Sequence, residues 1–136
     1  MSMQGPRYYR AVASGDMVRA GEQATRIADQ TPKRHEVLWR LEAGNAWRCA
    51  DQPTESLEQF DKADALTSDF DSGADISVTT EAGAAFTSQS LLPYQGTSYD
   101  RIMMNTYKAL CYLMTGNDDA ARVELRRAYE RQREAV

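Results

Sequence analysis

The regular placement of small and apolar residues around Gly116 constrains the fold most. Apolar or small residues recur at helical spacing on both sides of it: Ala109, Tyr112, Ala121, Leu125 and Ala128. Residues spaced by three or four share one face of an α-helix, and glycine tolerates the backbone angles of a tight turn. The stretch TYKALCYLMTGNDDAARVELRRAYE therefore predicts two helices that pack against each other across a turn.

The same pattern recurs in two earlier segments, and it resembles the tetratricopeptide repeat (TPR), a pair of antiparallel helices of about 34 residues. The copy that begins at Val37 supplies the residues Gly44, Trp47, Ser56, Phe60 and Ala63 at the corresponding positions. A weaker copy at the chain start supplies Gly15, Ala20, Ala24, Ile27 and Pro32. Small residues at these positions let paired helices approach closely, and larger ones fill the space beside them.

We therefore predict an all-α fold, a single TPR-like solenoid of about three repeats over residues 1–136. The repeats cover about 1–34, 37–70 and 102–135, and an insertion covers about 71–99. The insertion opens with turn-rich, acidic residues, and Thr97 and Asp100 form a capping box for the next helix. The first helix is expected to be short and to begin near Pro6. A generic helical bundle is the alternative.

The segment from Leu91 to the chain end also resembles a narrower group, an uncharacterised family of bacterial TPR-like proteins that are often lipoproteins of the cell envelope. The shared residues are Pro93, Tyr94, Gly96, Tyr99, residues 106–110, Tyr112, Leu113, Gly116, residues 121–124 and residues 126–128. Asn105 and Cys111 depart from the family pattern. The resemblance implies no known activity; it implies protein contacts and a periplasmic or envelope location. It also implies a longer protein, of which this chain is a trimmed portion.

Composition excludes several classes of function. The chain has 136 residues with a net charge of -4, which argues against general affinity for nucleic acid. No apolar run approaches the length of about 18 residues that spans a membrane. No export signal is visible, so a cytoplasmic location stays open beside the envelope. The acidic stretch over residues 51–75 is interpreted as a solvated helix surface.

The sequence predicts no enzyme, no cofactor and no metal. His35 is the single histidine and lies in a charged stretch at a helix start, where we expect it to be exposed. No motif for nucleophilic, metal or nucleotide chemistry is present. The stretch DFDSGADISVTTE is similar to an EF-hand loop, but its glycine and its glutamate are each displaced by one position, so a solvated loop is favoured. Cys49 and Cys111 are interpreted as small packing residues.

In a TPR stack the first helix of each pair lines a concave groove. In the copy that begins at Val37 the groove residues are Leu38, Leu41, Asn45, Arg48 and Cys49. In the copy that begins at Ile102 they are Met103, Thr106, Leu110, Leu113 and Met114. The first set predicts a peptide contact through Asn45 and Arg48. The second set is apolar and exposes a hydrophobic patch unless something covers it.

We expect the insertion to cover the apolar set, with Phe86, Leu91 and Leu92 as the covering side chains; chain outside this sequence and a partner are the alternatives. The predicted function is a noncatalytic scaffold for a protein or peptide partner, in a bacterial envelope complex. The alternative is a self-associating module that uses the apolar set as a homo-oligomer interface.

Overall fold

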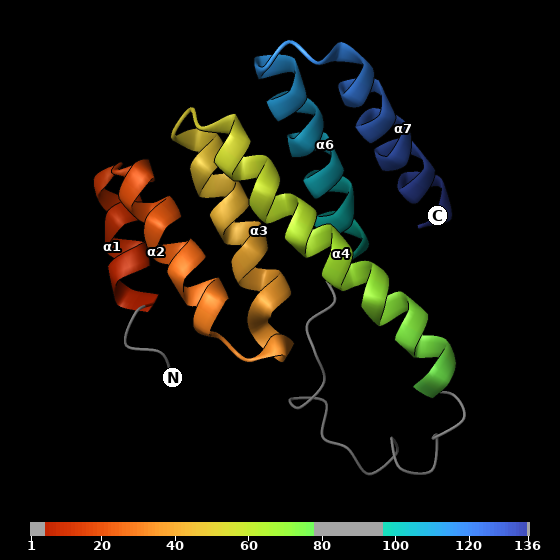
Figure 1. The fold of residues 1–136 in the computed structure, drawn as a ribbon, viewed down its shortest axis with the longest axis horizontal. Helices are drawn as coiled ribbons and strands as arrows, with labels where there is room; N and C mark the ends of the chain where they lie inside the picture. The colour runs from red at the N-terminus through yellow and green to blue at the C-terminus, as the bar shows by residue number, and fades with distance from the viewer. Residues whose placement is uncertain (1–4, 78–96, 136) are drawn as a thin grey trace.

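The computed structural model describes residues 5–77 and 97–135, and every regular element in these ranges is an α-helix. In chain order the helices are α1 (Gly5–Ser14), α2 (Met17–Gln30), α3 (Lys33–Cys49), α4 (Pro53–Ser77), α6 (Ser98–Met114) and α7 (Asp118–Glu134) (Figure 1). The prediction of an all-α fold is confirmed. The first helix begins at Gly5, next to Pro6, as the sequence indicates.

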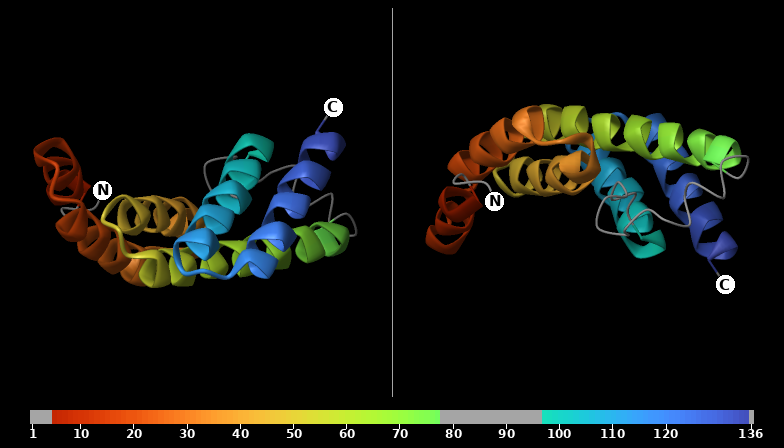
Figure 2. Two further views of the ribbon diagram at one scale, coloured as in Figure 1. Left: turned by 90° about the horizontal axis from the view of Figure 1, so that it is seen from above. Right: turned by 90° about the horizontal axis from the view of Figure 1, so that it is seen from below.

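Helices that are neighbours in the sequence pack against each other in space (Figure 1). The pairs α2–α3, α3–α4 and α6–α7 make the most extensive contacts, and α4 joins the last pair to the rest through α6. Figure 2 shows α4 along one side of the molecule. Helices α3 and α6 both lie on the same side of α4. Helices α3 and α6 touch each other only slightly, and residues of both line a groove between them.

Turns and caps at the helix ends follow from specific residues. Gly15 and Gly116 have φ angles of 80° and 78°, in the left-handed region that glycine adopts without steric cost. Asp51 adopts the same region, with φ 61°, in the turn between α3 and α4. The capping box is confirmed: the Asp100 backbone N–H donates to the Thr97 hydroxyl, and the Thr97 N–H donates to the Asp100 carboxylate, both at 3.1 Å.

Small residues in the core bring paired helices close together. The repeat residues that the structure buries are Ala20, Ala24, Ile27, Gly44, Ser56, Phe60, Ala63, Ala109, Ala121 and Ala128. A Cβ atom on Gly44 would lie 2.5 Å from the Phe60 ring, and one on Gly21 would lie 2.6 Å from the Trp47 ring. The absence of a side chain at both glycines therefore leaves room for an aromatic ring of the neighbouring helix.

Two local expectations are wrong. Helix α4 continues through Asp69 to Ser77, where a turn-rich opening of the insertion was expected. No proline interrupts this stretch, and a lone glycine such as Gly73 costs a helix only about 1 kcal/mol. Leu125 was expected to fill space between helices, yet its side chain is 49% exposed. The outer face of α7 has no helix packed on it in the part of the chain that the structure describes.

We expect the substitution Gly44→Ala to destabilise the fold by about 1–3 kcal/mol, because the added methyl group overlaps the Phe60 ring. Gly5→Ala is the control, since a Cβ atom there meets nothing within 4 Å and alanine favours a helix by about 0.5–1 kcal/mol. Urea unfolding followed by circular dichroism measures both. A Gly44→Ala protein as stable as the wild type would show that the helices separate freely at this contact.

Candidate functional site

A pocket of about 160 Å³ lies in the groove between α3 and α6. It is lined by Leu41, Glu42 and Asn45 of α3, by Phe60 of α4, and by Tyr99, Asp100, Met103, Met104 and Tyr107 of α6. Phe60 and Met104 are fully buried and form the inner wall, whereas the Tyr99 side chain is largely exposed at the mouth. The pocket therefore combines an apolar inner wall with polar lining residues, among them the carboxylates of Glu42 and Asp100.

This pocket brings together members of the two groove sets predicted from the sequence. Leu41 and Asn45 come from the set on α3, and Met103 comes from the apolar set on α6. Leu38 is exposed, and Cys49 is exposed at the end of α3; neither lines the pocket. The pocket thus joins part of each predicted set, namely Leu41, Asn45 and Met103.

Asn45 and Arg48, the predicted peptide contacts, are already engaged within the chain. An Nη atom of Arg48 donates to the Asn45 side-chain oxygen at 2.8 Å, and the guanidinium lies 4.2 Å from the centre of the Tyr107 ring. A cation over an aromatic face is attracted by the negative potential of the ring. Arg48 therefore joins α3 to α6, and the groove offers fewer free polar groups than the sequence indicates.

The apolar set on α6 divides into a buried part and an exposed part. Thr106 is half-buried, and its hydroxyl donates to the Ile102 carbonyl at 2.9 Å. Leu110, Leu113 and Met114 are 42%, 50% and 46% exposed. Phe86, Leu91 and Leu92, which were expected to cover them, lie outside the described residues. An apolar surface of this kind on one helix is typical of a contact site.

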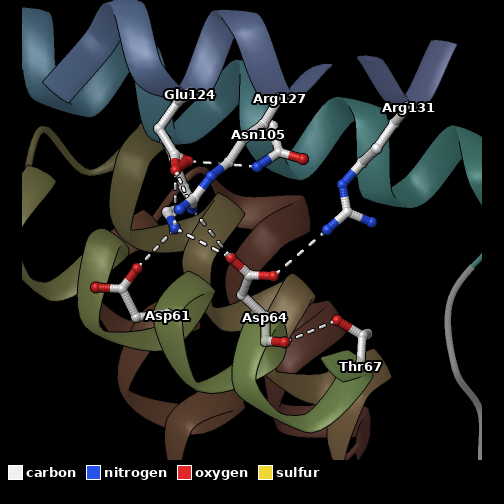
Figure 3. A network of polar contacts seen from close by, with 8 residues as sticks. Asp61, Asp64, Thr67, Asn105, Glu124, Arg127 and Arg131 are labelled. Atoms are coloured by element: carbon white, nitrogen blue, oxygen red, sulfur yellow. Dashed lines mark hydrogen bonds and ion pairs between the residues drawn. The ribbon is translucent and has the colours of Figure 1, made fainter. Parts of the chain in front are cut away.

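A buried polar network, which sequence reasoning missed, lies behind the groove (Figure 3). The Lys108 amine, on a side chain only 4% exposed, lies 2.8 Å from Asp61, 3.4 Å from Asp64 and 3.3 Å from Glu124. Figure 3 shows Arg127 and Arg131 of α7 directed at the same region, where Arg127 contacts Glu124 at 3.0 Å and Arg131 contacts Asp64 at 3.6 Å. The network joins α4, α6 and α7.

The negative charges around Lys108 keep its amine protonated. Burial alone lowers the pKa of Lys108, but the hydrogen bond that its amine donates to Asp61 and the negative charges of Glu124, Asp61 and Asp64 outweigh it, so the pKa is raised. Lys108 therefore stays charged at neutral pH. Glu124 is buried as well. Its partners are cations and the Asn105 amide, however, which favours a structural role over proton transfer.

A second buried cation, Arg40 of α3, forms an equivalent junction in the preceding helices. Its guanidinium contacts Asp29 of α2 at 2.9 Å and Glu36 at 3.0 Å, and it donates to the Gln59 side chain of α4 at 2.8 Å. The Arg40–Gln59 and Asn105–Glu124 hydrogen bonds both span 19 residues. Comparison of polar residues between the predicted copies would have found this shared position.

Neither cysteine forms a disulfide, and the two differ in environment. Cys111 is fully buried, and its thiol lies 3.3 Å from the Ser56 hydroxyl. Burial raises the pKa of this thiol, although the Ser56 hydrogen bond and the Arg48 charge oppose the shift. Cys49 is exposed, so the expectation that it packs inside the fold is wrong. It occupies the end of α3, where the chain turns outward.

Comparisons with protein-family models, curated proteins and solved structures found no match. Among the described residues, no cluster of histidine, cysteine or acidic side chains is arranged to hold a metal ion. No helix in the described ranges has the length and apolarity needed to cross a bilayer. The case for function therefore depends on the surface and the groove alone.

We expect Lys108→Met to destabilise the fold by about 3 kcal/mol, because it leaves the buried Glu124 carboxylate short of a partner. The control is Lys62→Met, whose ion pair with Glu58 is exposed and contributes no more than about 1 kcal/mol.

The same variant predicts a pH dependence. A lysine with a raised pKa stabilises the fold fully below its ordinary pKa of 10.5, and this stabilisation is lost as the pH rises through the higher folded value. The wild type should therefore lose more stability than Lys108→Met in alkaline solution, in urea titrations at a series of pH values. Equal losses would contradict the burial of a charged lysine.

Thiol labelling separates the two cysteines. We expect one thiol per folded chain to react with Ellman's reagent near neutral pH, because the raised pKa and the burial of Cys111 both slow its reaction. Cys49→Ser should remove the fast reaction, and urea should expose the second thiol. Fast labelling of the folded Cys49→Ser protein would show that Cys111 is accessible.

Proposed function

We propose that the protein is a noncatalytic, TPR-like scaffold that binds a protein or peptide partner in the groove between α3 and α6. The observation that carries this proposal is that α6 lines the pocket with its first half and exposes Leu110, Leu113 and Met114 in its second half. Exposed apolar side chains gathered on one helix cost solubility, and a partner that covers them recovers the hydrophobic free energy.

The repeat interpretation is supported by equivalent contacts in two helical pairs. Asn105 follows Arg40 by 65 residues, and Glu124 follows Gln59 by 65 residues, the same offset as between the copies that begin at Val37 and Ile102. Each pair joins the first helix of its copy to the second. A shared polar contact at one register favours related supersecondary units over an unrelated bundle.

The groove suits an extended or helical peptide with large apolar side chains. Met103, Met104 and Met114 lie on α6, and methionine adapts its shape to different partners. Leu41 and Tyr107 contribute the opposite and inner walls. Specificity then arises from which apolar side chains enter the pocket, with Glu42 and Asp100 favouring a nearby cation on the partner.

Two further parts of the proposal come from the sequence. An envelope location follows from the resemblance to bacterial envelope proteins, and a cytoplasmic location remains the alternative. Self-association through Leu110, Leu113 and Met114 is the second candidate function. The exposure of these three side chains favours it as much as it favours a different partner.

Affinity co-purification tests the scaffold function, with the protein as bait in an extract of its source organism. The test variant is Leu110→Asn/Leu113→Asn, because both side chains are exposed on α6 and their loss spares the core. The control is Val123→Asn/Leu125→Asn, which alters exposed apolar residues of α7. Asn45 and Arg48 are unsuitable, since their mutual hydrogen bond and the Tyr107 contact stabilise the fold.

We expect a partner that is retained by the wild type and by the α7 control, and lost with the α6 variant. A partner lost only with the α7 control would move the site to the outer face of the last helix. Light scattering after size exclusion tests the second candidate: a mass that grows with concentration, and falls to the monomer in the α6 variant, supports self-association.

A further inference from the structure

A second cleft, of about 580 Å³, lies at the other end of the molecule and outside the groove. It is lined by Gly5, Pro6 and Tyr9 of α1, by Thr31 and Pro32 between α2 and α3, and by Arg34, His35 and Trp39 of α3. Its lining is mainly apolar and aromatic.

The aromatic side chains of this cleft are held in place from inside. Tyr8 is buried, and its hydroxyl donates to the Glu42 carboxylate at 2.5 Å. Its ring packs edge-on against Tyr9 at 5.1 Å and against Trp39 at 5.4 Å between ring centres. The Tyr9 and Trp39 rings are 6.4 Å apart and inclined by 57°. Tyr9 and Trp39 therefore form two walls inclined to each other, and the buried Tyr8 ring supports both.

The chemistry of the walls favours one kind of ligand. The Tyr9 side chain is 62% exposed, and the indole N–H of Trp39 has no hydrogen-bond partner among the described residues. The other indole, of Trp47, donates to Thr25 at 2.9 Å. Tilted aromatic rings beside an open N–H donor match a polyproline II helix, whose rings stack on aromatic faces and whose carbonyls accept hydrogen bonds.

Charge at the rim adds a further requirement. Arg34 lines the cleft and Lys33 precedes it at the start of α3, and neither forms an ion pair with the described residues. The Arg34 Nε atom donates only to the neighbouring His35, at 3.2 Å. An acidic side chain on the ligand would complement these two cations.

We propose that this cleft binds a proline-rich segment of a partner protein, in polyproline II conformation, with acidic residues beside the prolines. Prolines of the ligand pack between Tyr9 and Trp39, the indole N–H of Trp39 donates to a ligand carbonyl, and Arg34 contacts the acidic residue. This binding is independent of the groove between α3 and α6, so it stands whether or not a partner binds there.

The test uses the signals of the two tryptophan indoles in the 15N-labelled protein. The probes are a synthetic proline-rich peptide that ends in glutamates, the same peptide with lysines in their place, and a glycine–serine peptide of equal length. We expect the glutamate peptide to shift the Trp39 signal in a saturable way and to leave the Trp47 signal unmoved. The lysine peptide should bind about two- to fivefold more weakly, and the glycine–serine peptide should not bind.

Matched variants distinguish binding at this cleft from nonspecific binding. Tyr9→Ala removes one wall and should weaken binding about tenfold, whereas Tyr129→Ala removes an equally exposed tyrosine of α7 and should change nothing. An unchanged Trp47 signal reports that each variant is folded, because it depends on the partly buried hydrogen bond to Thr25, which joins α2 and α3. Arg34→Glu, at an exposed position, leaves Lys33 opposed by a carboxylate and should abolish the preference for the acidic over the basic peptide.

Three outcomes would overturn the proposal. One is the absence of any Trp39 shift with the proline-rich peptides. Another is an equal shift of both indoles, which would show nonspecific contact. The third is undiminished binding to the Tyr9→Ala protein. In the first case an oligosaccharide is tested next. If it shifts the Trp39 signal where the peptides do not, the ligand of the cleft is a sugar that stacks on the same rings.

Discussion

The buried charge of Lys108 is the interaction on which the position of the last helical pair depends. Helices α4 and α6 meet over a modest contact, and the Lys108 amine lies within it, shared among carboxylates of α4 and α7. A buried cation binds its partners only in one arrangement, since any shift leaves a charge unpaired in a medium of low polarity. The network therefore sets where α6 stands relative to α3, and that distance defines the groove.

The two walls of the groove, α3 and α6, are held together in one region and not in another. Close to the pocket, Arg48 joins α3 to the Tyr107 ring of α6, so the walls are fixed there. Further along α6, Leu110, Leu113 and Met114 face solvent without a comparable contact. A partner would thus meet a preformed pocket at one end and an open apolar surface at the other. Preformed pockets reduce the entropy cost of binding.

The sequence predicts the helices and the small-residue contacts well, because both depend on local periodicity. The capping box at Thr97 and the turns at Gly15 and Gly116 follow from single residues. It does not predict the network around Lys108, since its members come from three helices and only their packing brings them together. The contact between Arg48 and Tyr107 depends on the angle between α3 and α6, which no repeat pattern gives. The chemistry of a site formed between elements is therefore the part that needs the structure.

One hydrogen bond connects the two surfaces of this molecule. The Tyr8 hydroxyl donates to Glu42, a residue that lines the groove pocket, while the Tyr8 ring supports Tyr9 and Trp39 in the aromatic cleft. Burial, followed by the hydrogen bond and charge of Glu42, raises the pKa of Tyr8, so this hydroxyl keeps its proton and remains a donor throughout the physiological range. The same contact therefore holds one lining residue of the groove pocket and the ring that supports the aromatic cleft, so both surfaces are built on it.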